Sequence, residues 1–253
     1  MSTRASDPRP RLLAGAAAMV ASAVPVVLIA LMVRDVADPL VRFDLRILRV
    51  TTGWTLRHDW LRTAAEVGAI VLHPWVFRLS VLAAALVLWR RGAQSAAMWA
   101  ASTMVVGTLL GAVLKLIVSR ARPALDDPVA TATGFSFPSG HSLNAALGVS
   151  LLVALLWRPA HDHGRRALLL GVGGLLIVLT GLDRVLLGVH FPSDVVAGWL
   201  VGVLVVVSSW VAFGPVLRER ARREAERAVD GEPTSDPAPD GGASAGSTPR
   251  RRV

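Results

Sequence analysis

Long apolar segments recur along the chain and are separated by short polar segments that are rich in arginine. The apolar runs cover residues 12–33, 64–89, 93–118, 143–157, 167–182 and 195–213. A helix that crosses a bilayer needs about 20 mainly apolar residues, and the first, third and sixth runs reach that length. His73, Pro74 and Arg78 interrupt the second run, and the fourth and fifth runs need flanking polar residues to span. We therefore predict an all-α fold, a multi-pass membrane helical bundle of about six transmembrane helices.

The arginines predict the orientation of these helices. They gather within residues 4–11, 90–91, 158–166 and 218–223, which six spans would place on one side of the membrane. Because positively charged loops stay inside, we expect a plasma membrane protein with cytoplasmic N- and C-termini. Residues 34–62 then face the other side, although they contain six arginines beside four aspartates. Their stretch VRFDLRILRV is amphipathic, which predicts a helix lying on the membrane surface.

The chain is predicted to have three parts. Residues 1–11 form a short cytoplasmic N-terminus, and residues 12–217 form the six-span membrane domain, with 34–62 as its extracytoplasmic interfacial segment. Residues 218–253 begin as a basic helical extension and continue as a tail rich in Gly, Pro and Ser. Such a tail has too little apolar surface to fold, so we expect it to be disordered.

Composition narrows the function classes. The chain is 53% hydrophobic, carries a net charge of +9 and contains no cysteine, which excludes disulfides, thiolate metal sites and cysteine nucleophiles. The positive charge lies at helix ends rather than on one basic face, so no nucleic-acid partner is predicted. Nothing in the sequence indicates an oligomeric state.

The first candidate site residues are two cations. Lys115 is the only lysine of the chain, and it lies in an apolar run seven residues before Arg122. Seven residues are about two helical turns, so we expect both to project from one face of a helix that ends at Pro123. The alternative is a lysine that reaches the interface, beside an interfacial arginine. Neighbouring charges are assigned to the interface and the loop: Arg120, Asp126 and Asp127.

The second candidate group is the stretch Phe-Pro-Ser-Gly-His-Ser at residues 137–142, directly before an apolar run. Ser139 is a suitable helix cap, and Gly140 allows close approach to a free backbone N–H. A helix N-terminus attracts anions, and His141 adds a titratable group beside it. Taken alone, the stretch also fits a capped helix with a hydrated histidine.

The third candidate group is Arg184, His190 and Asp194. A carboxylate bonded to one imidazole nitrogen fixes the tautomer and leaves the other nitrogen as a nucleophile or base. Asp194 alone would also be favourable in the first turn of a helix, because of the helix dipole. The remaining histidines lack such partners and are assigned no catalytic role: His58, His73, His161 and His163.

Together these residues predict metal-independent phosphoryl transfer. Three cations and a helix N-terminus suit the oxygens of a phosphoryl group, and two histidines allow the nucleophile and the acid to be separate residues. There are too few carboxylates to hold magnesium, and the third or fourth protein ligand that zinc needs is missing. We expect no metal and no cofactor.

The three groups closely resemble the three-part signature of the type-2 phosphatidic acid phosphatases, over about 80 residues from Lys115 to Asp194. The resemblance implies a helical bundle whose site faces outward in the bacterial enzymes. It implies that His190 attacks phosphorus and that Asp194 orients its ring, while His141 protonates the leaving alcohol and later activates water. The phosphate-binding residues that it implies are Lys115, Arg122, Ser139, Gly140 and Arg184. One departure is Asp183, which stands where the family usually has serine and could either hold Arg184 or weaken the positive field.

The sequence thus predicts an integral membrane phosphatase that acts on a lipid phosphate or polyprenyl (pyro)phosphate in the outer leaflet. Three alternatives stay open at this point. One is a phosphotransferase with an acceptor other than water, and another is a vanadate-dependent peroxidase, against which six spans argue. The third is an anion or lipid transporter, which would not need the His190–Asp194 pair.

Overall fold

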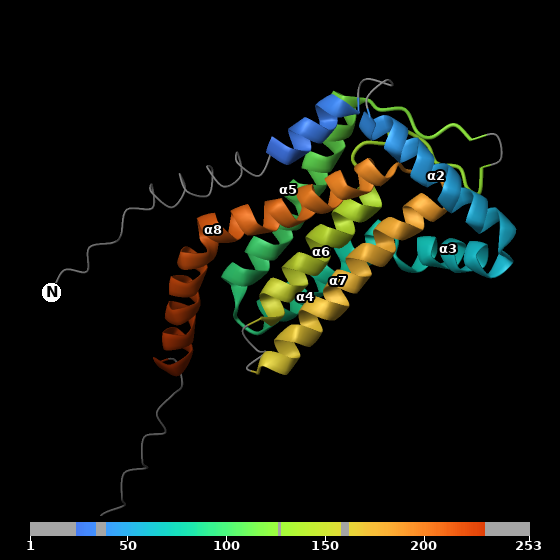
Figure 1. Cartoon of the computed structure of the whole chain (residues 1–253). Helices are drawn as coiled ribbons and strands as arrows, with labels where there is room; N and C mark the ends of the chain where they lie inside the picture. Colours follow the sequence, from blue (N-terminus) through green and yellow to red (C-terminus); the bar gives the residue numbers. More distant parts are fainter. Residues whose placement is uncertain (1–23, 34–38, 126–127, 158–161, 231–253) are drawn as a thin grey trace, which may run out of the picture.

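The computed structural model describes residues 24–33, 39–125, 128–157 and 162–230 of the 253-residue chain (Figure 1). The described part is helical and contains no strand, so the predicted all-α class is confirmed. Residues 24–32 are helical, and seven further helices follow: α2 (Pro39–Arg57), α3 (Asp59–Val71), α4 (Pro74–Arg90), α5 (Gln94–Val118), α6 (Gly140–Leu156), α7 (His163–Leu186) and α8 (Pro192–Asp230). Most of the predicted first span, Asp126, Asp127, His161 and the tail from 231 onward lie outside the described residues.

Four segments of the described chain are long and apolar enough to cross a membrane: Asp59–Arg90, Gln94–Val118, His163–Leu186 and Pro192–Leu217. They match the second, third, fifth and sixth predicted spans, whereas the fourth is the shorter apolar helix Gly140–Leu156. The predicted interruption of the second span lies between α3 and α4. There His73 caps α4, and Pro74 occupies its first turn. Backbone N–H groups in the first turn of a helix make no helical hydrogen bond, so a proline, which lacks this group, is tolerated there.

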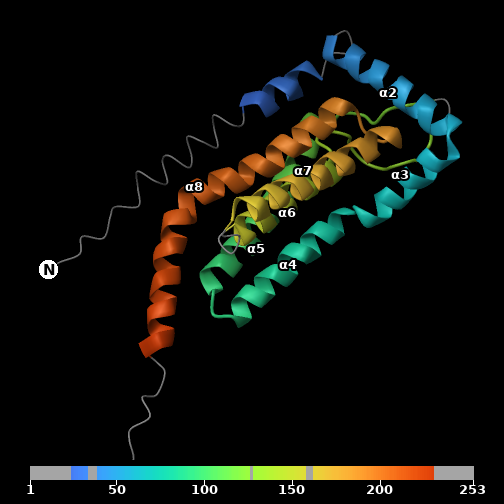
Figure 2. The same cartoon turned by 60° about the horizontal axis from the view of Figure 1, so that its bottom comes forward.

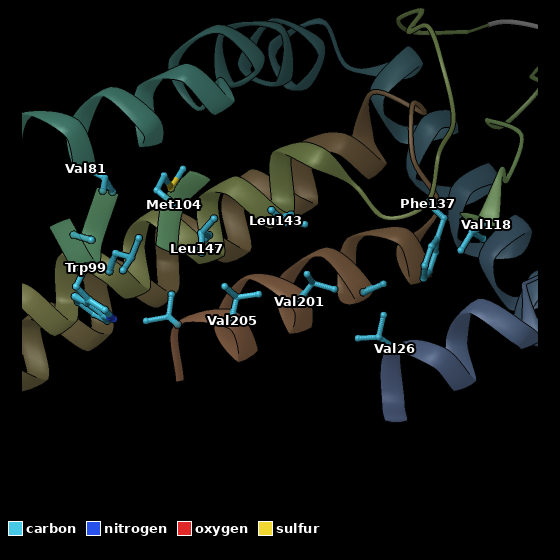
Figure 3. Close-up of a cluster of buried hydrophobic side chains, with 14 of the residues drawn as sticks. Val26, Val81, Trp99, Met104, Val118, Phe137, Leu143, Leu147, Val201 and Val205 are labelled. Atoms are coloured by element: carbon cyan, nitrogen blue, oxygen red, sulfur yellow. The ribbon is translucent and has the colours of Figure 1, made fainter. Parts of the chain in front are cut away.

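The core of the bundle lies between α6, α8 and α5 (Figure 3). Leu143 and Leu147 of α6 face Val201 and Val205 of α8 in this cluster. Two glycines of α8, spaced four residues apart, let the two helices approach closely. A Cβ on Gly198 would lie 2.7 Å from the Ser139 carbonyl oxygen, and one on Gly202 would lie 2.7 Å from that of Leu143. Small residues at this spacing are typical of close helix packing in membranes.

Helix α2 covers the end of the bundle where α7 and α8 meet, and α3 runs back from it toward α4 (Figure 2). Its buried residues recur every three or four positions: Val41, Asp44, Leu48, Thr52 and Thr55. The predicted amphipathic helix is therefore present, and its inner face packs on the ends of α7 and α8. The Thr55 hydroxyl also donates a hydrogen bond of 3.0 Å to the Leu186 carbonyl oxygen of α7.

Helix α8 continues beyond the membrane-length segment as far as Asp230. It bends sharply where its colour turns from orange to red, in the part of the helix that contains Pro215 (Figure 1). Proline removes a helical hydrogen bond and is a common cause of such a kink. The last part of α8, which carries the basic extension, therefore runs at an angle to the rest of the helix.

Candidate active site

The eight predicted site residues come from elements that meet at one end of the bundle. Lys115 and Arg184 lie in the last turns of α5 and α7, and His141 and Asp194 lie in the first turns of α6 and α8. Arg122 and His190 lie in the connecting loops, and Ser139 and Gly140 stand at the start of α6. Antiparallel helices bring these termini together, although the three groups are far apart in the sequence.

His190 is almost completely buried, with 2% of its surface exposed. Its Nε2 lies 3.1 Å from Nη1 of Arg122, and its Nδ1 lies 3.6 Å from Oδ2 of Asp194. Because a guanidinium can only donate, Nε2 accepts from Arg122 and the ring proton is on Nδ1, facing the carboxylate. Burial lowers the pKa of His190 to about 4, although the neighbouring Asp194 opposes this shift. The imidazole is thus neutral at pH 7, with its lone pair on Nε2.

Asp194 is held by several donors besides His190. Its Oδ2 accepts hydrogen bonds from the Ser136 hydroxyl and, at 3.0 Å, from the Phe191 backbone N–H. The Ser136 hydroxyl also lies 3.4 Å from Nδ1 of His190. Ser136 therefore bridges the two residues, and the carboxylate has little freedom to rotate away from the imidazole.

A buried ion network lies behind Asp194. Arg120 donates from Nη1 to Oδ1 of Asp194 at 2.7 Å and from Nη2 to Oδ2 of Asp44 at 2.9 Å. Asp44 is fully buried on α2, and it also accepts from the Ser193 backbone N–H at 2.9 Å and from the Ser193 hydroxyl. The assignment of Arg120 to the interface is wrong. Its side chain is 7% exposed and connects α2 to the start of α8.

Arg184 and His141 form the opposite side of the site. Nη1 of Arg184 lies 3.2 Å from Nε2 of His141. Asp183 holds the same guanidinium, through a bond of 2.7 Å from Nε and a contact with Nη2. Of the two expected effects of Asp183, the structure thus supports the one that fixes Arg184. His73 was assigned no role, yet its ring stacks edge-on against His141 with centroids 5.5 Å apart.

Lys115 and Arg122 do not share a helical face. Helix α5 ends at Val118, and Ser119 adopts a left-handed conformation with φ of 51°. The predicted continuation to Pro123 is wrong, because the chain turns there and carries Arg120 into the buried network. Arg122 instead lies in a loop, where it donates to the carbonyl oxygens of Thr133, Gly134 and Val189. Nζ of Lys115 donates to the Phe135 carbonyl oxygen at 2.7 Å, so both cations are fixed along the same loop.

The start of α6 has the predicted cap. Ser139 is buried, its hydroxyl accepts from the Ser142 N–H at 3.5 Å, and its own N–H donates to the Asp194 carbonyl oxygen. The Gly140 and His141 N–H groups are in the first turn, where no helical carbonyl precedes them, so they can donate to an anion. A Cβ on Gly140 would meet Lys115 Cε at 3.8 Å, so the lysine lies against this helix start.

Several residues of the site belong to no sequence motif. Asp44 lies far upstream in a segment dominated by arginine, and Ser136 and Ser193 are small polar residues beside motif positions. A weak signal existed for Asp44, because it falls on the apolar stripe of its amphipathic helix. Arg120 carried the opposite signal, since an arginine at a span end is ordinarily interfacial.

Comparison with known proteins indicates the family to which part of this chain is similar. Residues 96–217 match the model of the PAP2 superfamily. The chain contains a PAP2 superfamily domain. The matched range includes all eight predicted site residues but not Asp44.

Several curated proteins resemble the chain, and two of them are representative. Phosphatidylglycerophosphatase B of Bacillus subtilis is 39% identical over 105 residues, which are 40% of this chain and 51% of that protein. An undecaprenyl-diphosphatase of Sulfolobus acidocaldarius is 35% identical over 118 residues, which are 44% of this chain and 49% of that protein. The chain thus spans about half the length of the curated relatives that it matches.

A solved structure that resembles the chain is that of a transmembrane PAP2 type phosphatidylglycerolphosphate phosphatase from Bacillus subtilis. It superimposes with a TM-score of 0.63 at 23% identity, over 81% of this chain and 96% of that one. At this identity the likeness establishes the fold. The PAP2 domain is therefore part of a larger membrane helical fold that includes the helices before residue 96.

Proposed function

We propose that this chain is an integral membrane phosphatase that hydrolyses a lipid phosphate or a polyprenyl (pyro)phosphate, without a metal, through a phosphohistidine on His190. The observation that carries the proposal is the placement of His190, whose Nε2 faces Arg122 while its Nδ1 faces Asp194. A neutral imidazole held in this tautomer is a competent nucleophile. The names of the relatives, a phosphatidylglycerophosphatase and an undecaprenyl-diphosphatase, support a lipid phosphate as the substrate.

In the first step, Nε2 of His190 attacks phosphorus and forms a P–N bond, while the P–O bond to the lipid breaks. His141 gives a proton to the leaving oxygen, so the lipid departs as an alcohol, or as a monophosphate if the substrate was a diphosphate. Asp194 stabilises the imidazolium character that develops on His190. A bound phosphoryl group also offers Arg184 a charged acceptor in place of Nε2 of His141, which frees that nitrogen to hold a proton.

In the second step, the neutral His141 takes a proton from water, and the water oxygen attacks phosphorus. The P–N bond breaks, inorganic phosphate leaves and the lone pair of His190 returns to Nε2. His141 then holds the proton that the next cycle needs. Both residues end as they began, so the cycle is balanced.

The charge on the transferred group calls for donors that are already in place. Arg122 and Arg184 reach His190 and His141 respectively, and Lys115 lies against the N-terminus of α6. Together with the Gly140 N–H these groups surround the position between the two histidines. Preorganised donors of this kind stabilise the phosphoryl transition state because they need no reorientation during the reaction.

We further propose that the site faces the extracytoplasmic side. Arg90, Arg165 and Arg166 lie at the ends of α4 and α7 that are remote from the site. Positively charged helix ends favour the cytoplasm. A site at the opposite end is then accessible to lipids of the outer leaflet.

The experiment is phosphate release from lipid phosphates by the purified full chain in detergent with EDTA, comparing wild type with His190→Ala. Acid- and base-quenched samples of labelled substrate are examined for phosphohistidine, which survives base and is lost in acid. Wild type is expected to release phosphate and His190→Ala to release none. His141→Ala is expected to accumulate the phosphoenzyme when the leaving group is activated, because the second step then lacks its base.

Activity that persists in a folded His190→Ala variant would remove the assigned nucleophile. Phosphoryl transfer to an added alcohol without phosphate release would indicate a phosphotransferase. Folded wild-type protein that turns over no lipid phosphate at all would contradict the proposed function and favour a transporter.

A further inference from the structure

Arg78 is a charged residue within a membrane-length segment, one turn into α4. Its Nε donates to Oδ1 of Asn144 at 2.9 Å, and the Thr108 hydroxyl donates to the same oxygen at 3.1 Å. Nδ2 of Asn144 in turn donates to the Gly140 carbonyl oxygen at 2.7 Å. The amide of Asn144 is thus fixed by three bonds, and it holds Arg78 against α6.

The rest of the Arg78 guanidinium has no acceptor among the residues that the structure describes. Besides donating to Asn144, the guanidinium lies over the ring of Trp75, whose centroid is 4.9 Å from Cζ. The ion pairs of the described chain all involve other residues. Both terminal amino groups are therefore available as donors. An ionisable residue inside a span is costly and commonly marks a functional site.

Arg78 is connected to the region of the proposed acid, His141, through Asn144. Asn144 follows His141 by three residues on α6, which is about one helical turn. On α4, Arg78 follows His73 by five residues, and the ring of His73 contacts that of His141. Side chains of a helix incline toward its N-terminus, and the N-terminus of α4 is at the site. The guanidinium therefore lies about one turn deeper in the bundle than His141.

This position is on the leaving-group side of the site. His190 and Arg122 approach the transferred phosphoryl group from one side, and His141 would protonate the leaving oxygen on the other. The lipid attached to that oxygen must continue into the bilayer. We therefore expect an anionic group close to the leaving oxygen to extend toward Arg78.

We propose that Arg78 binds a second phosphate group, carried by the leaving portion of the substrate. The proposal rests on the proposed function, and it makes the preferred substrate a lipid with two phosphates rather than a lipid monophosphate. In the reaction, the P–O bond between the terminal phosphorus and the leaving oxygen breaks, the P–N bond to His190 forms, and His141 supplies the proton. The second phosphate stays on the lipid, paired with Arg78. A charge-assisted contact between guanidinium and phosphate is among the stronger polar contacts of proteins.

Two sources of a second phosphate are distinguished by the substrates in the test. In a polyprenyl diphosphate the two phosphates share an oxygen, whereas in phosphatidylglycerophosphate a glycerol separates them. Phosphatidate has a single phosphate and is the reference. The full-length protein in detergent is tested with all three, as wild type, Arg78→Gln, Arg78→Lys and Thr108→Val. Thr108→Val is the matched control, because it removes a hydrogen bond to the same Asn144 oxygen and leaves the charge in place.

We expect Arg78→Gln to lower kcat/KM about tenfold or more for a two-phosphate lipid relative to phosphatidate, with Arg78→Lys intermediate. The control is expected to leave that ratio unchanged. The two-phosphate lipid with the larger loss of kcat/KM then shows which distance between the two phosphates the site prefers. An equal loss for all three substrates in a folded Arg78→Gln variant would overturn the proposal, because Arg78 would then serve only the packing of α4 on α6.

A binding measurement separates this proposal from the proposed function. The His190→Ala variant is titrated with each of the three lipids, with and without Arg78→Gln. Tighter binding of a two-phosphate lipid that is lost with Arg78 supports the second phosphate site even if no hydrolysis occurs. Equal binding of all three lipids in the presence of Arg78 contradicts it, even if wild type is an active phosphatase.

Discussion

Asp44 of α2 and Asp194 of α8 bind the same guanidinium group, that of Arg120, through its two terminal nitrogens. All three side chains are buried, so the charges are screened by little water. Removing one partner of such a buried pair ordinarily costs about 3–5 kcal/mol. The orientation of Asp194 toward His190 therefore depends on a residue of a distant helix.

We predict that Asp44→Asn lowers kcat by about tenfold or more and changes KM little. The asparagine keeps an acceptor for the Ser193 N–H but loses the charge, so Arg120 is drawn toward Asp194 alone. Steady-state kinetics measure the effect. The control is Thr55→Val, which removes another buried bond between α2 and α7 but does not touch the network. It is expected to cost about 1 kcal/mol of stability and to leave kcat unchanged. Equal losses of kcat in both variants would mean that α2 acts only by general packing.

Asp183 is predicted to act by fixing Arg184. Replacing it with serine, the residue usual in the family, removes both contacts to the guanidinium. We expect KM for the lipid phosphate to rise about three- to tenfold, because the unheld arginine must be ordered when phosphate binds. Asp183→Asn retains one acceptor and should have the smaller effect. A KM that falls in Asp183→Ser would show that the negative charge weakens the site more than the contacts help it.

The ionisation of His190 is predicted to lie well below its ordinary range. Because its pKa is lowered from 6.5 to about 4, the unfolded chain binds this proton more readily than the folded one. The contribution to stability is thus fully present above pH 6.5 and is lost as the pH falls through about 4. Ring nitrogen chemical shifts of histidine-labelled protein, assigned with His190→Gln, should report a neutral His190 at pH 5. A midpoint near 6.5 would contradict the burial of the ring.

Close packing of α8 on α6 gives a stability prediction. Gly198→Ala places a methyl group 2.7 Å from the Ser139 carbonyl oxygen, so the helices must separate. Overpacking of this kind costs about 1–3 kcal/mol, and it should also lower kcat because Ser139 caps α6. Gly174→Ala of α7 is the matched control, since its Cβ would meet nothing within 4 Å. Thermal unfolding in detergent should show a lower midpoint for Gly198→Ala but not for Gly174→Ala. Equal midpoints would contradict the close packing of α8 on α6 at Gly198.

The sequence alone predicts those helix ends and caps that depend on neighbouring residues along the chain. The apolar length of residues 93–118 and the proline at 74 define helix bounds, and Ser139 caps α6 as its position suggests. The helix termini that carry His141 and Asp194 are found by spacing alone. These features depend on neighbours within one or two helical turns, so they can be predicted from the order of residues along the chain.

The sequence was insufficient where a charge is compensated across the fold. Arg120 is indistinguishable from an interfacial arginine until Asp44 is seen beside it. Likewise, Ser119 ends α5 in a left-handed conformation that no proline or glycine indicates, so the sequence predicts a helix at Arg122 where the structure has a loop. Asn144 gave no signal either, because a single amide in an apolar run has no periodic partner in the sequence.

The position of Asp44 also bears on modularity. The range that matches the family begins at residue 96, yet the counter-ion of Arg120 lies on a helix that precedes it. A domain boundary at that residue therefore separates Arg120 from Asp44. A protein that receives the domain would gain the buried arginine without its aspartate. Chimaeras that exchange PAP2 domains between such proteins should exchange α2 together with them, or restore the missing charge by a compensating substitution.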